Sequence, residues 1–173
     1  MSTDHHQHSI GTFLTYYKEY FQKVHNYLYY RTGRHREVAD DLCSEIFLKA
    51  FEKFHQYDPS RPFRVWIYTI ARNHLIDHYR SYRGEVSIDE VFGLSVDEGL
   101  AETIDKKNLA EKILKELKKI NPVYREIIML KYFGECTTEE MAEILNLSPN
   151  AVYVTLHRGL AKLRQLTKKD YGF

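Results

Sequence analysis

Apolar residues recur at helical spacing through the first eighty positions of the chain. From residue 13 they return every three or four positions, the period of one helix face: Phe13, Leu14, Tyr17, Phe21, Val24 and Leu28. Gly33 follows as a C-terminal cap. Similar stripes run over residues 39–54 and 63–79, separated by a stretch with two prolines, which lack a backbone donor. The pattern predicts three long helices packed as a small bundle.

The second half of the chain repeats this organisation after an interruption. Residues 84–105 contain three glycines and seven acids and have no sustained period, which is typical of a linker. Helical spacing returns at Leu109, stops at Asn121 and Pro122, and resumes until Gly134. We therefore predict an all-α protein of two small helical domains, residues 9–83 and 106–169, joined by a flexible acidic linker over residues 84–105.

Residues 137–164 have the pattern of a helix-turn-helix. Thr137 and Glu140 have capping-box spacing, which predicts a helix from about Thr138. Ser148 is a favoured N-cap and Pro149 a favoured first helical residue, so a second helix should begin there. We expect the short turn between them to bury Leu147. A short helix, a tight turn and a longer helix form the motif that places its second helix in the DNA major groove.

The N-terminal half of that second helix carries the candidates for base recognition. Polar, aromatic and basic side chains and one valine are expected to face outward there, where they could reach base edges: Asn150, Tyr153, Val154, His157 and Arg158. The basic residues that follow, from Lys162 to Lys169, suit phosphate contacts. The alternative is an ordinary helical hairpin with a solvated polar face.

Charge is sorted along the chain although the formal net charge is only +1. Residues 61–83 carry five arginines against one acid, and residues 106–173 carry 13 basic residues against eight acids. The linker between them carries seven acids and no lysine or arginine. This distribution favours two surfaces for a polyanion, joined by a segment that avoids it.

The helix predicted over residues 63–83 has a polar face opposite its apolar stripe. Aromatic rings stack on unpaired bases, arginines follow the phosphate backbone, and an amide can bind the edge of a base that has left the stack. Side chains of these kinds, with Asp77 among them on the same face, are concentrated in the helix and the preceding loop: Tyr57, Arg61, Phe63, Tyr68, Arg72, Asn73, Asp77 and Arg80. They indicate a protein that stabilises locally opened DNA. In the alternative interpretation, Asp77 and Arg80 simply pair along the helix and Trp66 belongs to the core.

The two cysteines and the lengths of the apolar runs indicate which sites to expect and where the protein works. Cys43 and Cys136 are far apart and lack metal-ligand spacing, so we expect two buried thiols in a reducing compartment and no cofactor or metal. We see no signal peptide and no apolar run of membrane-spanning length. These features predict a cytoplasmic protein.

Three stretches together resemble one protein family. They are DDLCSEIFLKAFEKF, FRVWIYTIARNHLIDHYR and NPVYREIIMLKYFGECTTEEMAEILNLSPNAVYVTLHRGLAKLR, and in this order they resemble the extracytoplasmic-function (ECF) subgroup of bacterial RNA polymerase sigma factors. The resemblance implies a sigma-2 domain that binds core RNA polymerase and the promoter −10 element, and a sigma-4 domain that binds the −35 element. It also implies an anti-sigma factor, such as a co-encoded membrane-bound protein, between the two domains.

The resemblance assigns residues to each of these contacts. Core polymerase would bind the second predicted helix at Asp41, Ser44, Glu45, Leu48 and Lys49. The −10 element would meet the residues named above between Tyr57 and Arg80, and the −35 element those between Asn150 and Arg158. The implied protein is a non-enzymatic factor that directs promoter recognition and transcription initiation.

Two other functions compete with this interpretation. A stand-alone helix-turn-helix regulator would account for residues 137–164 but leaves the aromatic loop and the helix over 38–54 without a role. A nucleic-acid-cleaving enzyme could use Asp40, Asp41 and Glu45 to hold Mg²⁺. The sequence offers no recognisable second carboxylate cluster for such an enzyme.

Overall fold

The computed structural model describes residues 2–83 and 106–171, and every element in them is helical. The all-α prediction is therefore confirmed. The N-terminal module consists of α1 (Ser2–Arg31), α2 (Arg36–Glu52), the short 3-10 helix η1 (Phe54–Gln56) and α3 (Phe63–Arg83). The C-terminal module consists of α5 (Lys106–Lys119), α6 (Pro122–Tyr132), α7 (Thr138–Leu145) and α8 (Pro149–Tyr171). No helix in the described part of the chain has the length and apolarity to cross a bilayer.

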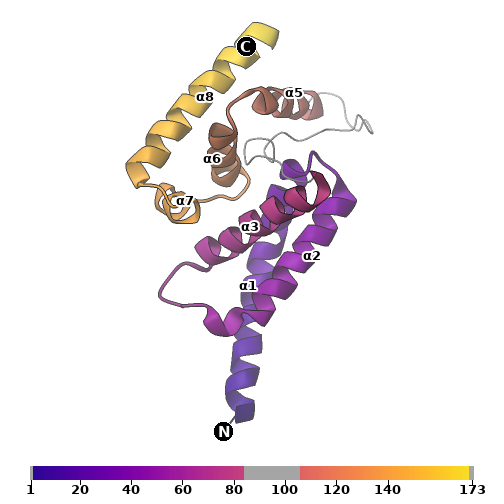
Figure 1. Ribbon diagram of the computed structural model, residues 1–173, viewed down its shortest axis with the longest axis vertical. Coiled ribbons are helices and arrows are strands. Elements are labelled where there is room, and N and C mark those ends of the chain that lie inside the picture. The colour runs from indigo at the N-terminus through magenta and orange to yellow at the C-terminus, as the bar shows by residue number, and fades with distance from the viewer. Residues whose placement is uncertain (1, 84–105, 172–173) are drawn as a thin grey trace.

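The N-terminal module is the predicted three-helix bundle (Figure 1). Helix α1 begins at Ser2, earlier than the apolar stripe suggested, and extends beyond the bundle at its N-terminal end (Figure 1). It ends at Arg31, after which Gly33 adopts a left-handed conformation with φ of 72°. The Tyr79 hydroxyl donates to the Arg31 carbonyl at 2.9 Å, which ties the end of α3 to the end of α1. The bundle therefore holds α3 against both other helices.

Two close contacts organise the C-terminal module. Arg125 on α6 is buried and donates to the backbone carbonyls of Leu117 and Lys118, at 2.7 and 2.6 Å, which caps the C-terminal end of α5. Burial lowers the pKa of Arg125 to about 10, and the nearby Arg31 adds to the effect. At Gly159 a Cβ would lie 3.0 Å from the Tyr124 Cβ, so glycine lets α8 cross α6 closely.

The helix-turn-helix has the predicted caps. The Thr137 hydroxyl accepts from the Glu140 amide at 3.1 Å while the Glu140 carboxylate accepts from the Thr137 amide at 2.8 Å, and α7 begins at Thr138. The Ser148 hydroxyl accepts from the Ala151 amide at 3.1 Å before α8. The expectation that Leu147 is buried was wrong, because it is 41% exposed. Asn146 adopts a left-handed conformation and turns the chain at this point. The Leu147 backbone amide donates to the Ala142 carbonyl of α7, while the Leu147 side chain is exposed to solvent.

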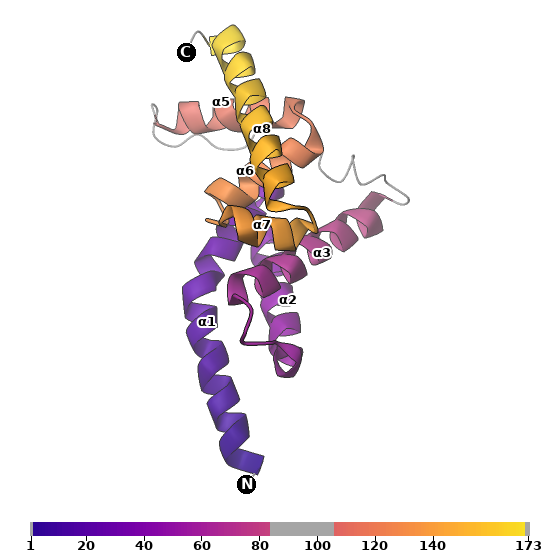
Figure 2. The ribbon, with the colours of Figure 1, turned by 90° about the vertical axis from the view of Figure 1, so that its left-hand side faces the viewer.

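The two modules pack directly against each other. Helix α7 lies against α3, and α6 lies against α1 (Figures 1 and 2). One continuous set of buried apolar residues runs through both modules and includes Tyr68 of α3 and Met129 of α6. The predicted acidic linker, residues 84–105, lies outside the described residues.

Both cysteines are buried, as predicted, and their chemistry is testable. Burial, with the nearby Asp40 carboxylate, raises the pKa of Cys43 to about 12. Burial, with the nearby Glu140, does the same to Cys136. Because the thiolate is the reactive form, we expect a thiol reagent at pH 8 to label neither residue in the native protein and both in denaturant. Rapid native labelling of Cys43, found by peptide mapping, would contradict this packing.

Candidate nucleic-acid interface

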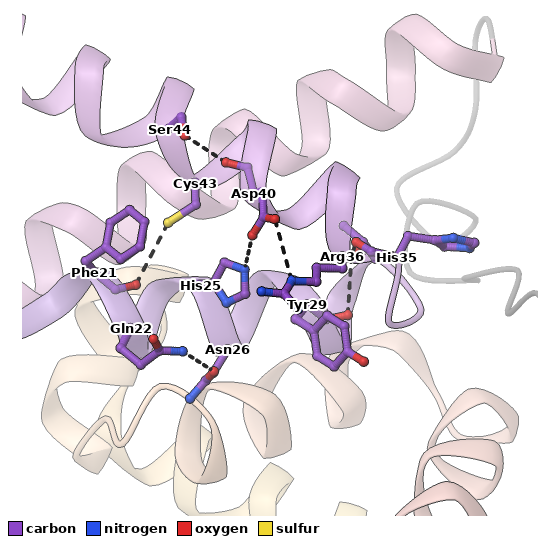
Figure 3. A network of polar contacts seen from close by, with 11 residues as sticks. Phe21, Gln22, His25, Asn26, Tyr29, His35, Arg36, Asp40, Cys43 and Ser44 are labelled. Carbon is purple, nitrogen blue, oxygen red and sulfur yellow. Dashed lines mark hydrogen bonds and ion pairs between the residues drawn. The ribbon is translucent and has the colours of Figure 1, made fainter. Parts of the chain in front are cut away.

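Helix α2 is fixed by a polar network on the side facing α1. His25 Nε2 of α1 is 2.6 Å from an Asp40 carboxylate oxygen, and Arg36 Nε is 3.8 Å from the other oxygen of Asp40 (Figure 3). The Cys43 thiol points toward the Phe21 carbonyl at 3.9 Å (Figure 3). These contacts orient the opposite face of α2 toward solvent.

That solvent face carries the five residues expected to contact polymerase. Asp41, Ser44 and Glu45 are exposed, and Lys49 is half-buried. Leu48 is 60% exposed, which is unusual for a leucine in a helix whose other leucine, Leu42, is 2% exposed. The structure therefore brings the five residues onto one accessible surface of α2, which we call the α2 face.

The acids considered for a magnesium site do not form one. Asp40 is engaged by His25 and Arg36, while Glu45 is 2.6 Å from His74 Nε2 on α3. Among the side chains that the structure describes, residues 10–83 and 112–170, no group of three or more potential metal ligands comes together. Asp40 and Glu45 instead attach α2 to its two neighbouring helices, while Asp41 is exposed.

An aromatic cluster lies beneath the loop between η1 and α3. Phe63 is 3% exposed and its ring stacks on Tyr16 with centroids 4.1 Å apart. Trp66 and Phe54 approach Phe63 at 5.4 and 6.5 Å, and the half-buried Tyr57 covers it at 5.4 Å. The Tyr57 hydroxyl donates to the Arg61 carbonyl at 2.7 Å, and burial raises the Tyr57 pKa. Phe63 thus supports the loop from below, and Tyr57 is the more accessible ring.

The outer face of α3 presents the polar candidates. Asn73, Asp77 and Arg80 are exposed and are spaced four and three residues apart, which places them on one side of the helix. Asp77 and Arg80 approach each other at 4.0 Å, so the alternative of a local pair applies to them, although both remain more than half exposed. Arg72 is half-buried beside this face.

Other predicted −10 residues lie at the boundary with the C-terminal module. Tyr68 is fully buried, with its ring 5.4 Å from Tyr27, and burial raises its pKa. The Arg61 Nη2 atom donates to Glu143 on α7 at 2.7 Å. In this arrangement Tyr68 is covered and Arg61 already has an acidic partner.

Helix α8 presents the remaining candidates to solvent. Asn150, His157 and Arg158 are exposed, Tyr153 is 62% exposed, and Val154 is half-buried. The Tyr153 and His157 rings approach at 6.5 Å, one turn apart. The N-terminal half of α8 is therefore accessible over its predicted recognition surface.

Comparisons with known proteins account for both modules. Residues 16–85 match the model of sigma-70 region 2, and residues 110–163 match that of sigma-70 region 4. The chain is 32% identical over 162 residues to the RNA polymerase sigma factor YlaC of Bacillus subtilis, covering 89% of this chain and 91% of that protein. It is 31% identical over 157 residues to the ECF RNA polymerase sigma factor SigW of the same organism, covering 84% and 83%. The chain belongs to the ECF sigma factors.

Solved structures support the same fold. The sigma factor RpoE of Bartonella quintana, crystallised with the anti-sigma factor NepR, superposes with a TM-score of 0.70 at 18% identity. The match covers 92% of this chain and 98% of that one. As an ECF sigma factor, the chain is a transcription-initiation factor that recognises promoters. The stand-alone helix-turn-helix regulator is not favoured, because it leaves the region 2 match unexplained.

Sequence reasoning missed the residues by which this sigma factor joins its two modules. Tyr27 and Arg31 of α1 contact Glu126 of α6, and Arg64 of α3 contacts α7. One signal was available: the aromatic residues of α1 occupy more than one face, since Tyr29 and Tyr30 lie off the face that Phe13, Tyr20 and Tyr27 share. A helix in a simple three-helix bundle needs only one such stripe.

Proposed function

We propose that this sigma factor recognises a promoter at two separate places while bound to core RNA polymerase. Residues 9–83 would form the domain that binds core polymerase and the −10 element, and residues 106–169 the domain that binds the −35 element. Residues 84–105 would connect the two. The observation that carries this proposal is the exposure of Asn73, Asp77 and Arg80 on α3, opposite the buried apolar face of that helix.

The −10 contacts would involve unpaired bases. Tyr57 offers a ring next to the loop, Asn73 offers an amide for a base edge, and Arg80 offers charge for the backbone. Phe63 would act from beneath, by holding the loop and Tyr57 in place. Arg61, Tyr68, Arg72 and Asp77 complete the proposed −10 surface.

The −35 contacts would be made in duplex DNA by α8. The exposed side chains of Asn150, Tyr153, His157 and Arg158 lie in the first three turns of a helix that follows a tight turn. This is the part of a recognition helix that reaches base edges in the major groove. Val154 would add an apolar contact beside them.

The partners follow from this role. Core polymerase would dock on the α2 face, where acids and Lys49 surround Leu48. An anti-sigma factor is a further proposed partner, supported by the anti-sigma complex of RpoE. We propose that the protein has no catalytic activity of its own and works in the cytoplasm, where polymerase and chromosomal DNA meet.

Reconstituted transcription tests the proposal. With core polymerase and genomic templates, we expect run-off products and permanganate-reactive thymines near the start sites only when this chain is present. The free chain should bind promoter duplex weakly, because a net charge of +1 neutralises few phosphates. Identical permanganate patterns with and without the chain would contradict the proposed function.

A further inference from the structure

The recognition helix α8 begins with a stretch that carries neither lysine nor arginine. Residues 149–157 read PNAVYVTLH, and Arg158 is the first lysine or arginine of the helix. Bidentate contacts from arginine or lysine to guanine are the commonest specific contacts in the major groove. The N-terminal part of a recognition helix is the part that reaches the base edges. In this chain that part lacks the side chains that make the usual guanine contact.

The centre of the exposed face of α8 combines an amide with an apolar side chain. Asn150 is exposed, and Val154 follows four residues later on the same side of the helix, half-buried. Val152 is 0% exposed and faces the core of the module. The Thr155 hydroxyl donates to the Ala151 carbonyl at 2.6 Å, so the helix backbone already uses this donor. The groups offered to base edges at this place are therefore one amide and the methyl groups of one valine.

Side chains of different chemistry flank this centre. Tyr153 and His157 are exposed on one side of it, with their rings 6.5 Å apart. On the other side Arg158 and Lys162 line a groove together with Lys119 of α5. Cations beside a helix that lies in the major groove suit the sugar-phosphate backbone, and such contacts fix the register without reading sequence. The base-reading positions lie between these two edges.

An amide and an apolar side chain both match A·T base pairs. Asparagine forms two hydrogen bonds with N6 and N7 of adenine, and the thymine methyl group accepts an apolar contact. Opposite a G·C pair, Val154 would cover a polar base edge and give it no hydrogen-bond partner, which costs free energy. Four residues span about 6 Å of helix, which corresponds to about two base-pair steps of 3.4 Å each.

We propose that α8 reads two A·T base pairs in the −35 element, about two base-pair steps apart. Asn150 binds the adenine of one pair, and Val154 packs on the thymine methyl group of the other. This inference rests on the proposed function, which makes α8 the reader of the −35 element but does not specify its base pairs. The two can fail separately, because promoter opening and −35 preference are separate measurements.

Selection from a promoter library tests the base preference. The full-length chain is combined with core polymerase, and the library is a template that gives a run-off product, with about ten base pairs around −35 randomised to span the reach of one helix. Templates retained in open complexes are sequenced. We expect A·T pairs to be enriched about tenfold over G·C pairs at two positions, the size of one good base contact. Val154→Arg should select guanine at one of these positions, since it introduces the missing guanidinium.

Removal of a single methyl group tests the contact of Val154. Each thymine of the selected core is replaced in turn by deoxyuridine, which lacks only the C5-methyl group. At one position the wild-type holoenzyme should bind about fourfold more weakly to the uracil template, as expected for one apolar carbon group left uncovered. Val154→Ala should bind the thymine and uracil templates equally.

Lys162→Ala is the control variant outside the base-reading positions. Lys162 is exposed two turns after Val154. A phosphate contact carries no sequence information, so this variant should weaken binding to both templates by the same factor. The fourfold preference for thymine should remain in Lys162→Ala and disappear in Val154→Ala.

Each outcome of these experiments has a separate meaning. Enrichment of G·C pairs, no preference at −35, or a thymine preference that Val154→Ala retains would overturn the inference and leave promoter opening intact. An A·T preference that survives both Asn150→Ala and Val154→Ala would also overturn it, since recognition would then depend on DNA shape. If no template of the library is opened, the proposed function is wrong and the inference falls with it.

Discussion

Replacing Leu48 by arginine should abolish stable binding to core RNA polymerase and leave the fold intact. Leu48 is 60% exposed on the α2 face, and water surrounds it in the free protein. An apolar anchor at the centre of an interface contributes about 2 kcal/mol or more, so its replacement by a charge should weaken binding at least about 30-fold. An exposed substitution changes the free energy of unfolding by about 0.5 kcal/mol or less.

Titration of labelled protein with core polymerase, followed by fluorescence anisotropy, measures this effect. Tyr132→Arg is the matched control, because Tyr132 is a large apolar residue with 58% exposure on α6. It should bind core polymerase like the wild type. Equal affinity of Leu48→Arg and Tyr132→Arg would show that polymerase docks elsewhere, and an unfolded Leu48→Arg would contradict the exposure of the side chain.

The bounds of α3 and the start of α7 could be predicted because their causes are local, whereas the start of α1 at Ser2 was not. The bounds of α3 at Phe63 and Arg83 follow from a proline before it and an apolar stripe within it. The start of α7 follows from the reciprocal bonds of Thr137 and Glu140, which are three residues apart. Each signal lies within a few residues of the feature that it determines.

The packing of the modules could not be predicted in the same way. Tyr27 and Glu126 are 99 residues apart, and Arg61 and Glu143 are 82 apart. Glu126 lies in an ordinary amphipathic helix, where a charged residue is expected to be solvated. Its burial depends on which helix of the other module covers it, and the linker sequence does not encode that geometry.

The burial of Tyr68 has the same origin. Its ring lies against Tyr27 and within reach of the C-terminal module, where a Cβ on Gly134 would come 3.2 Å from it. An aromatic residue on a helix with a polar face could equally be a base-stacking residue or an interdomain contact. Only the tertiary arrangement distinguishes these roles, and in this structure Tyr68 is buried at the contact between the modules.

Substitution of Phe63 should lower the stability of the protein, whereas substitution of Asn73 should impair DNA opening without lowering stability. We expect Phe63→Ala to lower the free energy of unfolding by about 3–5 kcal/mol, measured by urea denaturation, because it removes a buried ring that five aromatic neighbours surround. That loss is a large part of the total stability of a small domain, about 5–15 kcal/mol. The loop that carries Tyr57 should lose its order at the same time.

Asn73→Ala is the matched truncation on the exposed face of the same helix. It should leave the unfolding curve within about 0.5 kcal/mol of the wild type, since no buried contact is removed. It should nevertheless reduce permanganate reactivity at the −10 element in reconstituted transcription, because an unpaired base would lose its amide partner. If Asn73→Ala opened promoters as well as the wild type, the exposed face of α3 would not hold the base. If Phe63→Ala kept full stability, the ring would not be the support of the loop, and its role would have to be sought in direct contact with DNA.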